Sequence, residues 1–452
     1  MQTSEHIKQQ LQEFTQYLAA GQLEQARRIL NQLHPAEIAH LLETLPLEQR
    51  EIAWELVDRE LGGDVLTYVN DEVRSHLIQD MAPDELVAAT EGLDTDDLAD
   101  LLPDLPEPVI DELFRSMDEQ NRQRLESVLQ YPEDTAGGLM NVDTITIRPD
   151  VSLEVVQRYL RLHGELPETT DKLFVVNRED RFLGTLALTD LVTKDPELTV
   201  AEVLNRETKA IPVTASTREV ARLFEKRNLI SAPVVDENDR LLGRITIDDV
   251  VDVIREEADH SLMSMAGLDE EDDMFAPVVR STQRRAVWLG VNLLTALLAS
   301  WVIGLFDTTI EKLVALAVLM PIVASMGGIA GSQTLTLVTR GLALGKVSGS
   351  NAKILLRKEL AVGALNGLLW ASVIGILAAL WFDDLGLGVV IGLAVIANLL
   401  VAALASATIP LILQKFGADP ALAGSVVLTT ITDVVGFFAF LGLASLFLVP
   451  GS

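Results

Sequence analysis

The chain has 452 residues, with 35 Lys+Arg against 66 Asp+Glu, a formal net charge of −31 and no cysteine. This acid excess excludes binding to phosphate backbones, so we expect no nucleic-acid partner, and the lack of cysteine excludes disulfides and thiolate metal sites. The charge is uneven: residues 280–452 hold only 10 Lys+Arg and 7 Asp+Glu, which leaves about −34 for the preceding part.

Residues 1–130 show helical periodicity in short pieces that begin at prolines such as Pro35 and Pro83. Proline in a first helical turn followed by acids is a start signal, and its recurrence predicts an α-helical, superhelical N domain. The first twenty residues lack the apolar core of a signal peptide, so we expect this domain to stay in the cytosol.

Residues 173–192 and 232–251 form an internal repeat at an offset of 59 residues. Each copy has a β-rich run, a polar turn, a second β-rich run and a helix start, preceded by an amphipathic helical segment at 152–163 or 216–228. This order resembles a tandem pair of α/β CBS domains, here residues 131–200 and 201–257.

The CBS resemblance implies an adenine-nucleotide (ATP) site at the motif G-h-x-[ST]-x-x-D. The second copy keeps it as Gly243, Thr246 and Asp249, whereas Ala187 replaces the hydroxyl residue in the first copy, so at most one site is expected to be intact. An alternative stays open, in which Thr246 and Asp249 only cap the following helix, because Thr and Asp are good N-caps.

Acidic residues form two clusters outside the apolar part of the chain. One lies in the N domain and the other follows the second CBS unit: Asp94, Asp96, Asp97 and Asp100, then Asp248, Asp249, Asp252, Glu256, Glu257 and Asp259. One such run alone would indicate a solvated face. Two clusters on facing domains repel each other, so bound divalent cations would draw the domains together, and segment 252–274 would transmit the movement to the first span.

Five apolar runs are long enough to cross a bilayer, at about 286–306, 313–339, 360–382, 385–413 and 421–449, which predicts an all-α transmembrane domain over residues 281–452. Basic residues precede the first run, join the second to the third and follow the fourth. The positive-inside rule then predicts a multi-pass protein of the plasma (cell inner) membrane with a cytoplasmic N-terminus and an outside C-terminus.

Asp433 is the only charged residue in the run from Ala421 to Val449. A carboxylate at bilayer depth costs several kcal/mol and usually faces protein or a water-filled path. Ser425, Thr429 and Asp433 are spaced by four and share one helix face. This hard-oxygen set suits magnesium, calcium or manganese, and a single carboxylate favours magnesium, which keeps most of its waters.

A glycine cluster follows Pro321 in the second run, with Gly327, Gly328 and Gly331 inside five residues. Such a cluster weakens a helix and can turn backbone carbonyls out of the hydrogen-bond ladder. Together with the stripe at Asp433, it predicts a path for a hydrated cation.

The chain resembles the MgtE family of magnesium channels over nearly its whole length. The most specific matches are Gly327-Gly328-x-x-Gly331-x-Gln333 after Pro321, Asp419-Pro-Ala-Leu-Ala423, and Thr429-Thr-Ile-Thr-Asp433-Val-Val-Gly436. The resemblance implies a homodimer in the membrane lipid, with an ion path on its two-fold axis and a plug helix over residues 258–280.

The resemblance also implies roles for individual residues. A hydrated magnesium ion would be held at Asp433, Thr429 and Ser425, with Gly327 and Gly328 as weaker candidates. Regulatory magnesium between the cytosolic domains would favour closure, and its candidate ligands are Asp94, Asp97, Asp248, Asp249, Asp252, Glu256, Glu257, Asp259 and Asp419.

This chain departs from the family pattern at three places. Ile329 stands where an asparagine is usual, Gly424-Ser425-Val426 replaces Ser-Gly-Pro, and Ala258-Asp259-His260-Ser261 replaces Ala-Thr-Glu-Asp. The first two bear on selectivity, and the third predicts weaker or differently placed magnesium sensing. Two other functions stay open: a proton-coupled secondary transporter of divalent cations, and a membrane-anchored CBS nucleotide sensor. No nucleophile–base pair, P-loop or HExxH motif indicates an enzyme.

Overall fold

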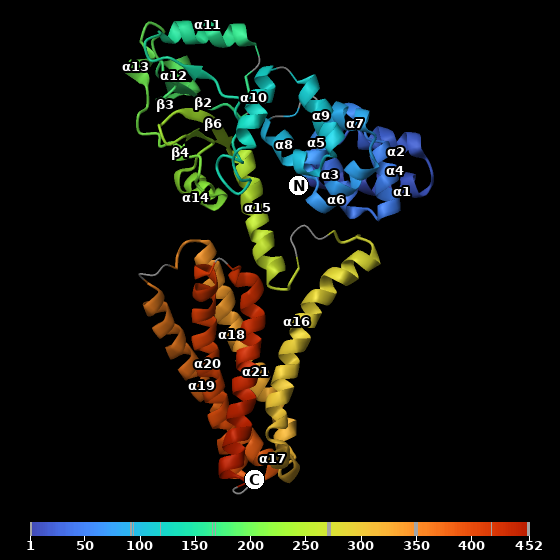
Figure 1. Cartoon of the computed structure of the whole chain (residues 1–452), viewed down its shortest axis with the longest axis vertical. Coiled ribbons are helices and arrows are strands. Elements are labelled where there is room, and N and C mark those ends of the chain that lie inside the picture. Colours follow the sequence, from blue (N-terminus) through green and yellow to red (C-terminus); the bar gives the residue numbers. More distant parts are fainter. Residues whose placement is uncertain are drawn as a thin grey trace. The chain divides into compact units, whose positions relative to one another are not determined.

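The computed structural model describes residues 2–90, 93, 95–117, 119–164, 166–167, 169–268, 273–347, 351–416 and 418–449. The chain divides into two compact units, the first made of residues 1–258 and 271–277 and the second of residues 259–270 and 278–452. Figure 1 shows the helices and strands of each unit.

The N domain in the first unit is entirely helical, as predicted. Its short helices are α1 (Gln2–Ala19), α2 (Leu23–Leu30), α3 (Pro35–Thr44), α4 (Leu47–Glu55), α5 (Arg59–Tyr68), α6 (Asp71–Asp80), α7 (Pro83–Thr90), α8 (Thr95–Leu101), the 3-10 turn η1 (Leu102–Asp104), α9 (Glu107–Ser116) and α10 (Glu119–Val128). The predicted proline starts are seen at α3 and α7, which begin at Pro35 and Pro83. Proline fits there because the first helical turn needs no backbone N–H.

The internal repeat is confirmed as two copies of one three-stranded unit. Their elements are β1 (Thr146–Ile147), α11 (Leu153–His163), β2 (Lys172–Val176), β3 (Phe182–Ala187), α12 (Leu188–Thr193) and α13 (Val200–Val203), then β4 (Ile211–Pro212), α14 (Thr217–Arg227), β5 (Ser231–Val235) and β6 (Leu241–Thr246). In each sheet the first strand is parallel to the second and the second antiparallel to the third. Even the register shift recurs, at Val175/Val176 and at Val234/Val235.

The two CBS copies differ in what they pack against. The first copy has its own core around Val156, Val175 and Leu186. The core of the second copy, which includes Phe224 and Ile245, is continuous with that of the N domain. The segment after α10 joins them, because Ala136 N–H donates to Ala215 O at 2.7 Å and Gly137 N–H to Val213 O at 2.9 Å.

Five helices of the described second unit are long and apolar enough to cross a membrane. They are α16 (Val278–Gly304), α18 (Ala315–Ala343), α19 (Ala352–Phe382), α20 (Leu385–Lys415) and α21 (Pro420–Phe447), with the short α17 (Asp307–Lys312) after α16. The five predicted spans are therefore confirmed. Several helices run beyond the apolar stretches into basic residues such as Arg284, because hydropathy marks only their apolar part.

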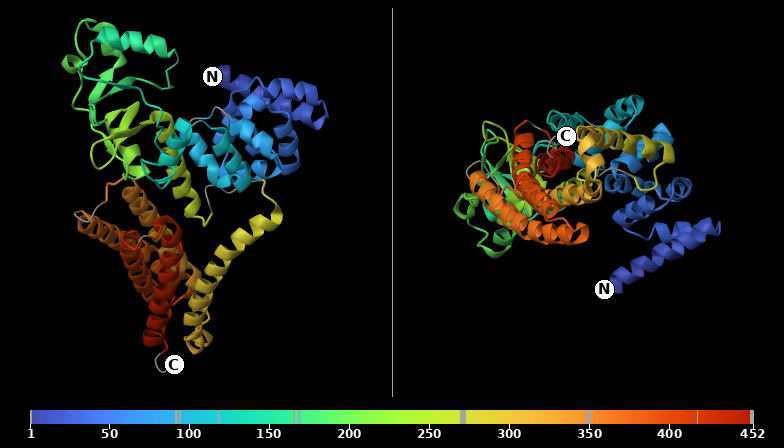
Figure 2. Two further views of the ribbon diagram at one scale, coloured as in Figure 1. Left: turned by 45° about the horizontal axis from the view of Figure 1, so that its top comes forward. Right: turned by 90° about the horizontal axis from the view of Figure 1, so that it is seen from below.

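Helix α20 is the centre of this bundle and packs against α18, α19 and α21. Helix α16 packs against α21, and the two lie close near the end of α16 and diverge toward its start (Figures 1 and 2). Helix α18 runs unbroken through Gly327, Gly328 and Gly331. The predicted turning of backbone carbonyls out of the hydrogen-bond ladder is thus not seen there, and Gly327 and Gly331 pack closely against neighbouring helices.

Candidate functional site

The predicted polar stripe lies on one continuous helix, α21. The helix begins after Asp419, whose carboxylate accepts hydrogen bonds from the N–H groups of Ala421 (2.8 Å) and Leu422 (3.2 Å). Because no break follows before Phe447, spacing by four places Ser425, Thr429 and Asp433 on one face.

The Asp433 carboxylate is half-buried, and within the described ranges it makes no hydrogen bond or ion pair. Four residues earlier, the Thr429 hydroxyl donates to Ser425 O at 3.0 Å and lies near Val426 O at 3.1 Å. Its oxygen can still accept a hydrogen bond. The arrangement can thus present one carboxylate and hydroxyl oxygens to the water shell of a cation.

The glycines of α18 let this helix approach α21 closely. A Cβ at Gly331 would lie 3.0 Å from Leu428, and one at Gly424 would lie 3.2 Å from Leu335. Gly328 has open space around it, and Ile329 beside it is 60% exposed. Gly331 therefore packs α18 against α21, Gly327 packs against Asn398 of α20, and Gly328 faces outward from this monomer.

The acids of the N domain and of helix α15 (Ile247–Ser264) influence one another within the first unit. Burial raises the pKa of Asp100 on α8 to about 6; Arg74 lowers it, and Glu133, Glu256 and Asp249 raise it further. Burial, followed by Asp97 and α15 acids, also raises the pKa of Tyr68 at the end of α5. The two predicted clusters therefore share one region of negative potential.

On α15 itself, burial raises the pKa of Asp249 to about 6, with Asp248 adding to the shift, while hydrogen bonds from Thr246 oppose it. Burial also raises the pKa of Asp252, which Arg255 lowers and Asp248 raises. Glu257 accepts a hydrogen bond from Arg218 Nε at 2.6 Å. Within the residues that the structure describes, no three acidic or histidine side chains lie close enough to hold a metal ion together. Asp94 lies outside the described residues.

The last two regulatory candidates belong to the second unit. Asp259 is exposed near the end of α15. Asp419 caps α21, and its carboxylate lies 3.4 Å from His260 Nε2. His260 stands at one of the positions where the sequence departs from the family pattern, so an imidazole, not a carboxylate, meets Asp419.

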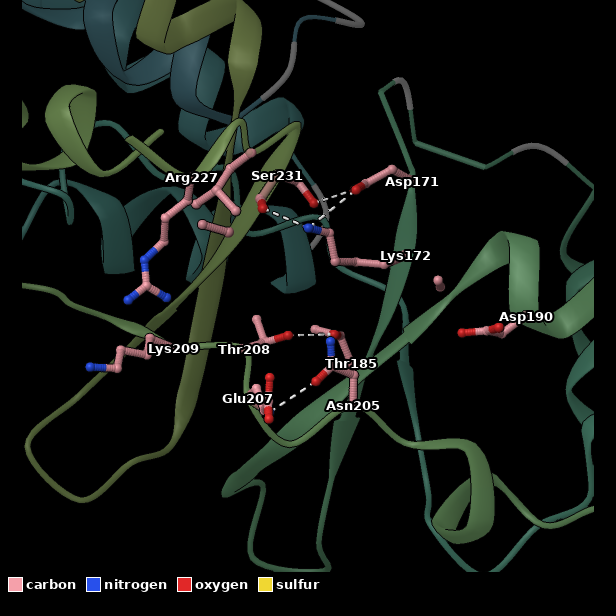
Figure 3. Close-up of a pocket in the computed structure, with 13 residues that line it drawn as sticks. Asp171, Lys172, Thr185, Asp190, Asn205, Glu207, Thr208, Lys209, Arg227 and Ser231 are labelled. Atoms are coloured by element: carbon pink, nitrogen blue, oxygen red, sulfur yellow. Dashed lines mark hydrogen bonds and ion pairs between the residues drawn. The ribbon is translucent and has the colours of Figure 1, made fainter. Parts of the chain in front are cut away.

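A cavity of about 380 Å³ lies between the two CBS copies (Figure 3). Its lining includes Ala187 and Asp190, which correspond in the first copy to Thr246 and Asp249. Arg227 and Lys209 extend on the side opposite Asp190 (Figure 3). Across the cavity, Lys172 Nζ donates to Ser231 O at 2.8 Å and pairs with Asp171 at 3.1 Å.

The nucleotide candidates Thr246 and Asp249 do not line this cavity, and they bond to each other. Thr246 Oγ1 donates to Asp249 Oδ2 at 2.9 Å, and Thr246 N–H donates to the same oxygen at 3.2 Å. The sequence reasoning missed Asp190 as a candidate, although the offset of 59 residues from Asp249 pointed to it.

Three family models match the chain. The MgtE "Divalent cation transporter" model covers residues 320–443, the "MgtE intracellular N domain" model covers 33–134, and the CBS domain model covers 136–197 and 200–256. Together they cover most of the N domain, both repeat copies and most of the membrane bundle.

Curated relatives match over almost the full length. The chain is 30% identical to "Magnesium transporter MgtE" of Thermus thermophilus, covering 95% of this chain and 97% of the relative. It is 26% identical to the protein of the same name in Bacillus subtilis, covering 95% and 96%. A solved cytosolic domain of the Mg²⁺ channel MgtE in complex with ATP is 32% identical and covers 54% of this chain and 99% of that one, with a TM-score of 0.49. The chain belongs to the MgtE family of magnesium transporters, and it is a multi-pass membrane protein, not an enzyme.

Proposed function

We propose that this chain is a magnesium-selective channel whose ion path passes Asp433. The observation that carries the proposal is the half-buried Asp433 carboxylate on α21, which has no protein partner in the described residues and stands in line with Ser425 and Thr429. A magnesium ion gives up its waters reluctantly, so one carboxylate and a few hydroxyl oxygens can hold it through its hydration shell.

Cytosolic magnesium would close this channel by binding between the acidic N domain and the CBS pair. Support comes chiefly from Asp249 on α15, whose pKa is raised to about 6 by partial burial and by the neighbouring Asp248; the pKa of the more exposed Asp100 is raised in the same direction. A divalent cation would remove that repulsion, as it does wherever like charges share a site. Helix α15 carries Asp248, Asp249 and Asp252 and continues as far as Ser264, so cation binding would act on a rigid element.

The pathway would be completed by a second copy of the chain, with Asp433 of each protomer near a two-fold axis. In one copy the Asp433 face of α21 is only partly covered, as a shared path requires. Basic residues such as Arg280 and Lys358 flank the spans on one side, which supports a cytoplasmic N-terminus and an outside C-terminus.

ATP is a second ligand that the CBS pair would bind. In the cavity of Figure 3, the Asp190 carboxylate would accept hydrogen bonds from ribose hydroxyls, and Arg227 and Lys209 would face phosphates. The alternative position at Thr246 and Asp249 would first require their mutual hydrogen bond to open.

Magnesium flux into liposomes tests the main proposal. Asp433→Ala should abolish flux while the protein remains folded, and Asp307→Ala, which removes an exposed carboxylate from the same unit, should leave flux unchanged. Normal flux in Asp433→Ala would overturn the proposal. For the gate, millimolar magnesium should protect residues 240–275 from protease.

The same preparation separates the two rival functions. A proton-coupled carrier would show currents that follow the proton gradient and not the magnesium gradient. A membrane-anchored nucleotide sensor would show ATP binding and no flux at all, in wild type and in Asp433→Ala alike.

A further inference from the structure

The side chain of Asn398 is a buried polar group in the middle of the membrane bundle. It lies on the central helix α20 and is only 1% exposed. Its Nδ2 donates a hydrogen bond to Val323 O on α18 at 2.9 Å. Its Oδ1 is buried and has no hydrogen-bond partner in the described part of the chain. An amide buried in this way costs free energy that an apolar side chain would not.

Two glycines on two other helices leave room for this amide. A Cβ at Gly327 on α18 would lie 2.3 Å from Asn398 Nδ2, and a Cβ at Gly436 on α21 would lie 2.7 Å from the same atom. Both distances are far below van der Waals contact. The Asn398 amide therefore fills the space between α18 and α21, and any larger residue at either glycine would displace it.

This position lies beside the candidate ion site. Gly436 follows Asp433 by three residues, less than one helical turn, on the same unbroken helix. On the other side of Asp433 along α21, the spacer between the two helices is Leu428, which meets Gly331 of α18. The helical turn that carries Asp433 thus lies between two side chains that separate α18 from α21: the apolar Leu428, and Asn398, which is hydrogen-bonded to α18.

We propose that Asn398 is a positioning residue of the ion path: by bonding to Val323 O and packing on Gly436, it sets the separation of α18 and α21 and with it the place of the Asp433 carboxylate. The proposal rests on the function assigned to Asp433 above. A hydrogen bond has a direction, so it fixes the rotamer of the spacer, which a leucine with the same branching could not do because it cannot donate a hydrogen bond. The selectivity of the path should therefore depend on Asn398, although this side chain is too buried to touch the ion.

The first test separates the hydrogen bond of Asn398 from the branched shape of its side chain. Asn398→Leu keeps the number and branching of the side-chain heavy atoms, with a larger volume, but removes the hydrogen bond. Asn398→Ala removes both, and the readout is the ratio of magnesium to calcium flux in liposomes containing equal amounts of folded protein. Both variants should lower this ratio by about three- to tenfold, the effect expected from losing one interhelical hydrogen bond. A merely structural role would change the amount of folded protein and leave the ratio unaltered.

The second test uses the contact with Gly436. Gly436→Ala should reduce magnesium flux, and the double variant Gly436→Ala/Asn398→Ala should recover at least several-fold over Gly436→Ala alone, because the new methyl group enters the space that the amide leaves. The matched control on α21 is Gly442→Ala, whose Cβ would meet only Phe306 at 3.9 Å, so flux should stay at the wild-type level.

Two results would overturn the proposal: a wild-type flux ratio in Asn398→Leu, or no recovery in the double variant. If Gly436→Ala does not fold, the flux ratios of Asn398→Leu and Asn398→Ala decide the question alone. Failure of the assigned function would look different, because Asp433→Ala would then still conduct magnesium.

Discussion

The two units of this chain differ in how their carboxylates are arranged: one is isolated in the membrane unit, and several lie near one another in the first unit. In the membrane unit, Asp433 is the single acid within its span and has no protein partner among the described residues. In the first unit, burial raises the pKa of Asp100 and of Asp249 to about 6, and neighbouring acids add to both shifts. We therefore expect ion flux to depend strongly on Asp433 alone, whereas cation binding in the first unit should depend on several carboxylates together.

The largest effect is expected from neutralising the lone carboxylate. Asp433→Asn keeps the size and shape of the side chain but removes its charge, so magnesium flux should fall by two orders of magnitude or more, on the order of a 3 kcal/mol loss of cation stabilisation. Asp249→Asn, in the shared field, should retain most of the flux. Both variants should be measured in one liposome series. Equal losses of flux would contradict the distinction between the isolated Asp433 and the neighbouring acids of the first unit.

The next effect concerns a buried ion pair in the first unit. Arg50 is 1% exposed, and it donates to Asp273 through Nη1 (2.8 Å) and Nη2 (3.1 Å) and to Leu42 O through Nε (2.9 Å). Arg50→Ala would leave the buried Asp273 carboxylate uncompensated and should destabilise the N domain by about 3–5 kcal/mol. Hydrogen exchange of α3 and α4 in the full-length protein measures this.

The control for that experiment is Arg59→Ala, which removes the exposed pair with Glu85. The side chain of Arg59 is 77% exposed, and such pairs contribute about 0–1 kcal/mol. Equal exchange rates in the two variants would contradict the distinction between the buried and the exposed pair.

The sequence predicted the elements of this fold well where the signal is local. The repeat at an offset of 59 residues located β2, β3, β5 and β6, and the spacing by four located the stripe on α21. Arg50 and Asp273, in contrast, are 223 residues apart, and no pattern links them. Asn398 is likewise one polar residue in an apolar run, and its meaning depends on where Gly327 and Gly436 meet it in space.

A smaller effect should appear in the pH dependence of the first unit without magnesium. An acid whose pKa rises from its usual 3.8 to about 6 on folding destabilises the folded state when ionised. Stability should therefore increase as the pH falls through 6, and this gain is complete below about pH 4. In EDTA, amides of α8 and α15 should exchange up to about tenfold more slowly at pH 5 than at pH 7, after correction for intrinsic rates.

Other groups titrate in the same range, so the double variant Asp100→Asn/Asp249→Asn supplies the reference. Its exchange rates should change less between pH 7 and pH 5 than those of the wild type. An identical pH dependence in the two proteins would show that these carboxylates do not carry the shift.

The smallest effect is expected from removing one member of the shared field. Asp252→Asn removes one of several negative charges on α15. The magnesium concentration that gives half-maximal protection of residues 240–275 from protease should therefore change by less than about twofold. The triple variant Asp248→Asn/Asp249→Asn/Asp252→Asn should change it by about tenfold or more, because the repulsion that a cation would relieve is then largely gone. If Asp252→Asn alone abolished protection, the α15 acids would form one specific site with an indispensable ligand, and the acidic cluster of the first unit would depend on a single carboxylate in the same way as the proposed path at Asp433.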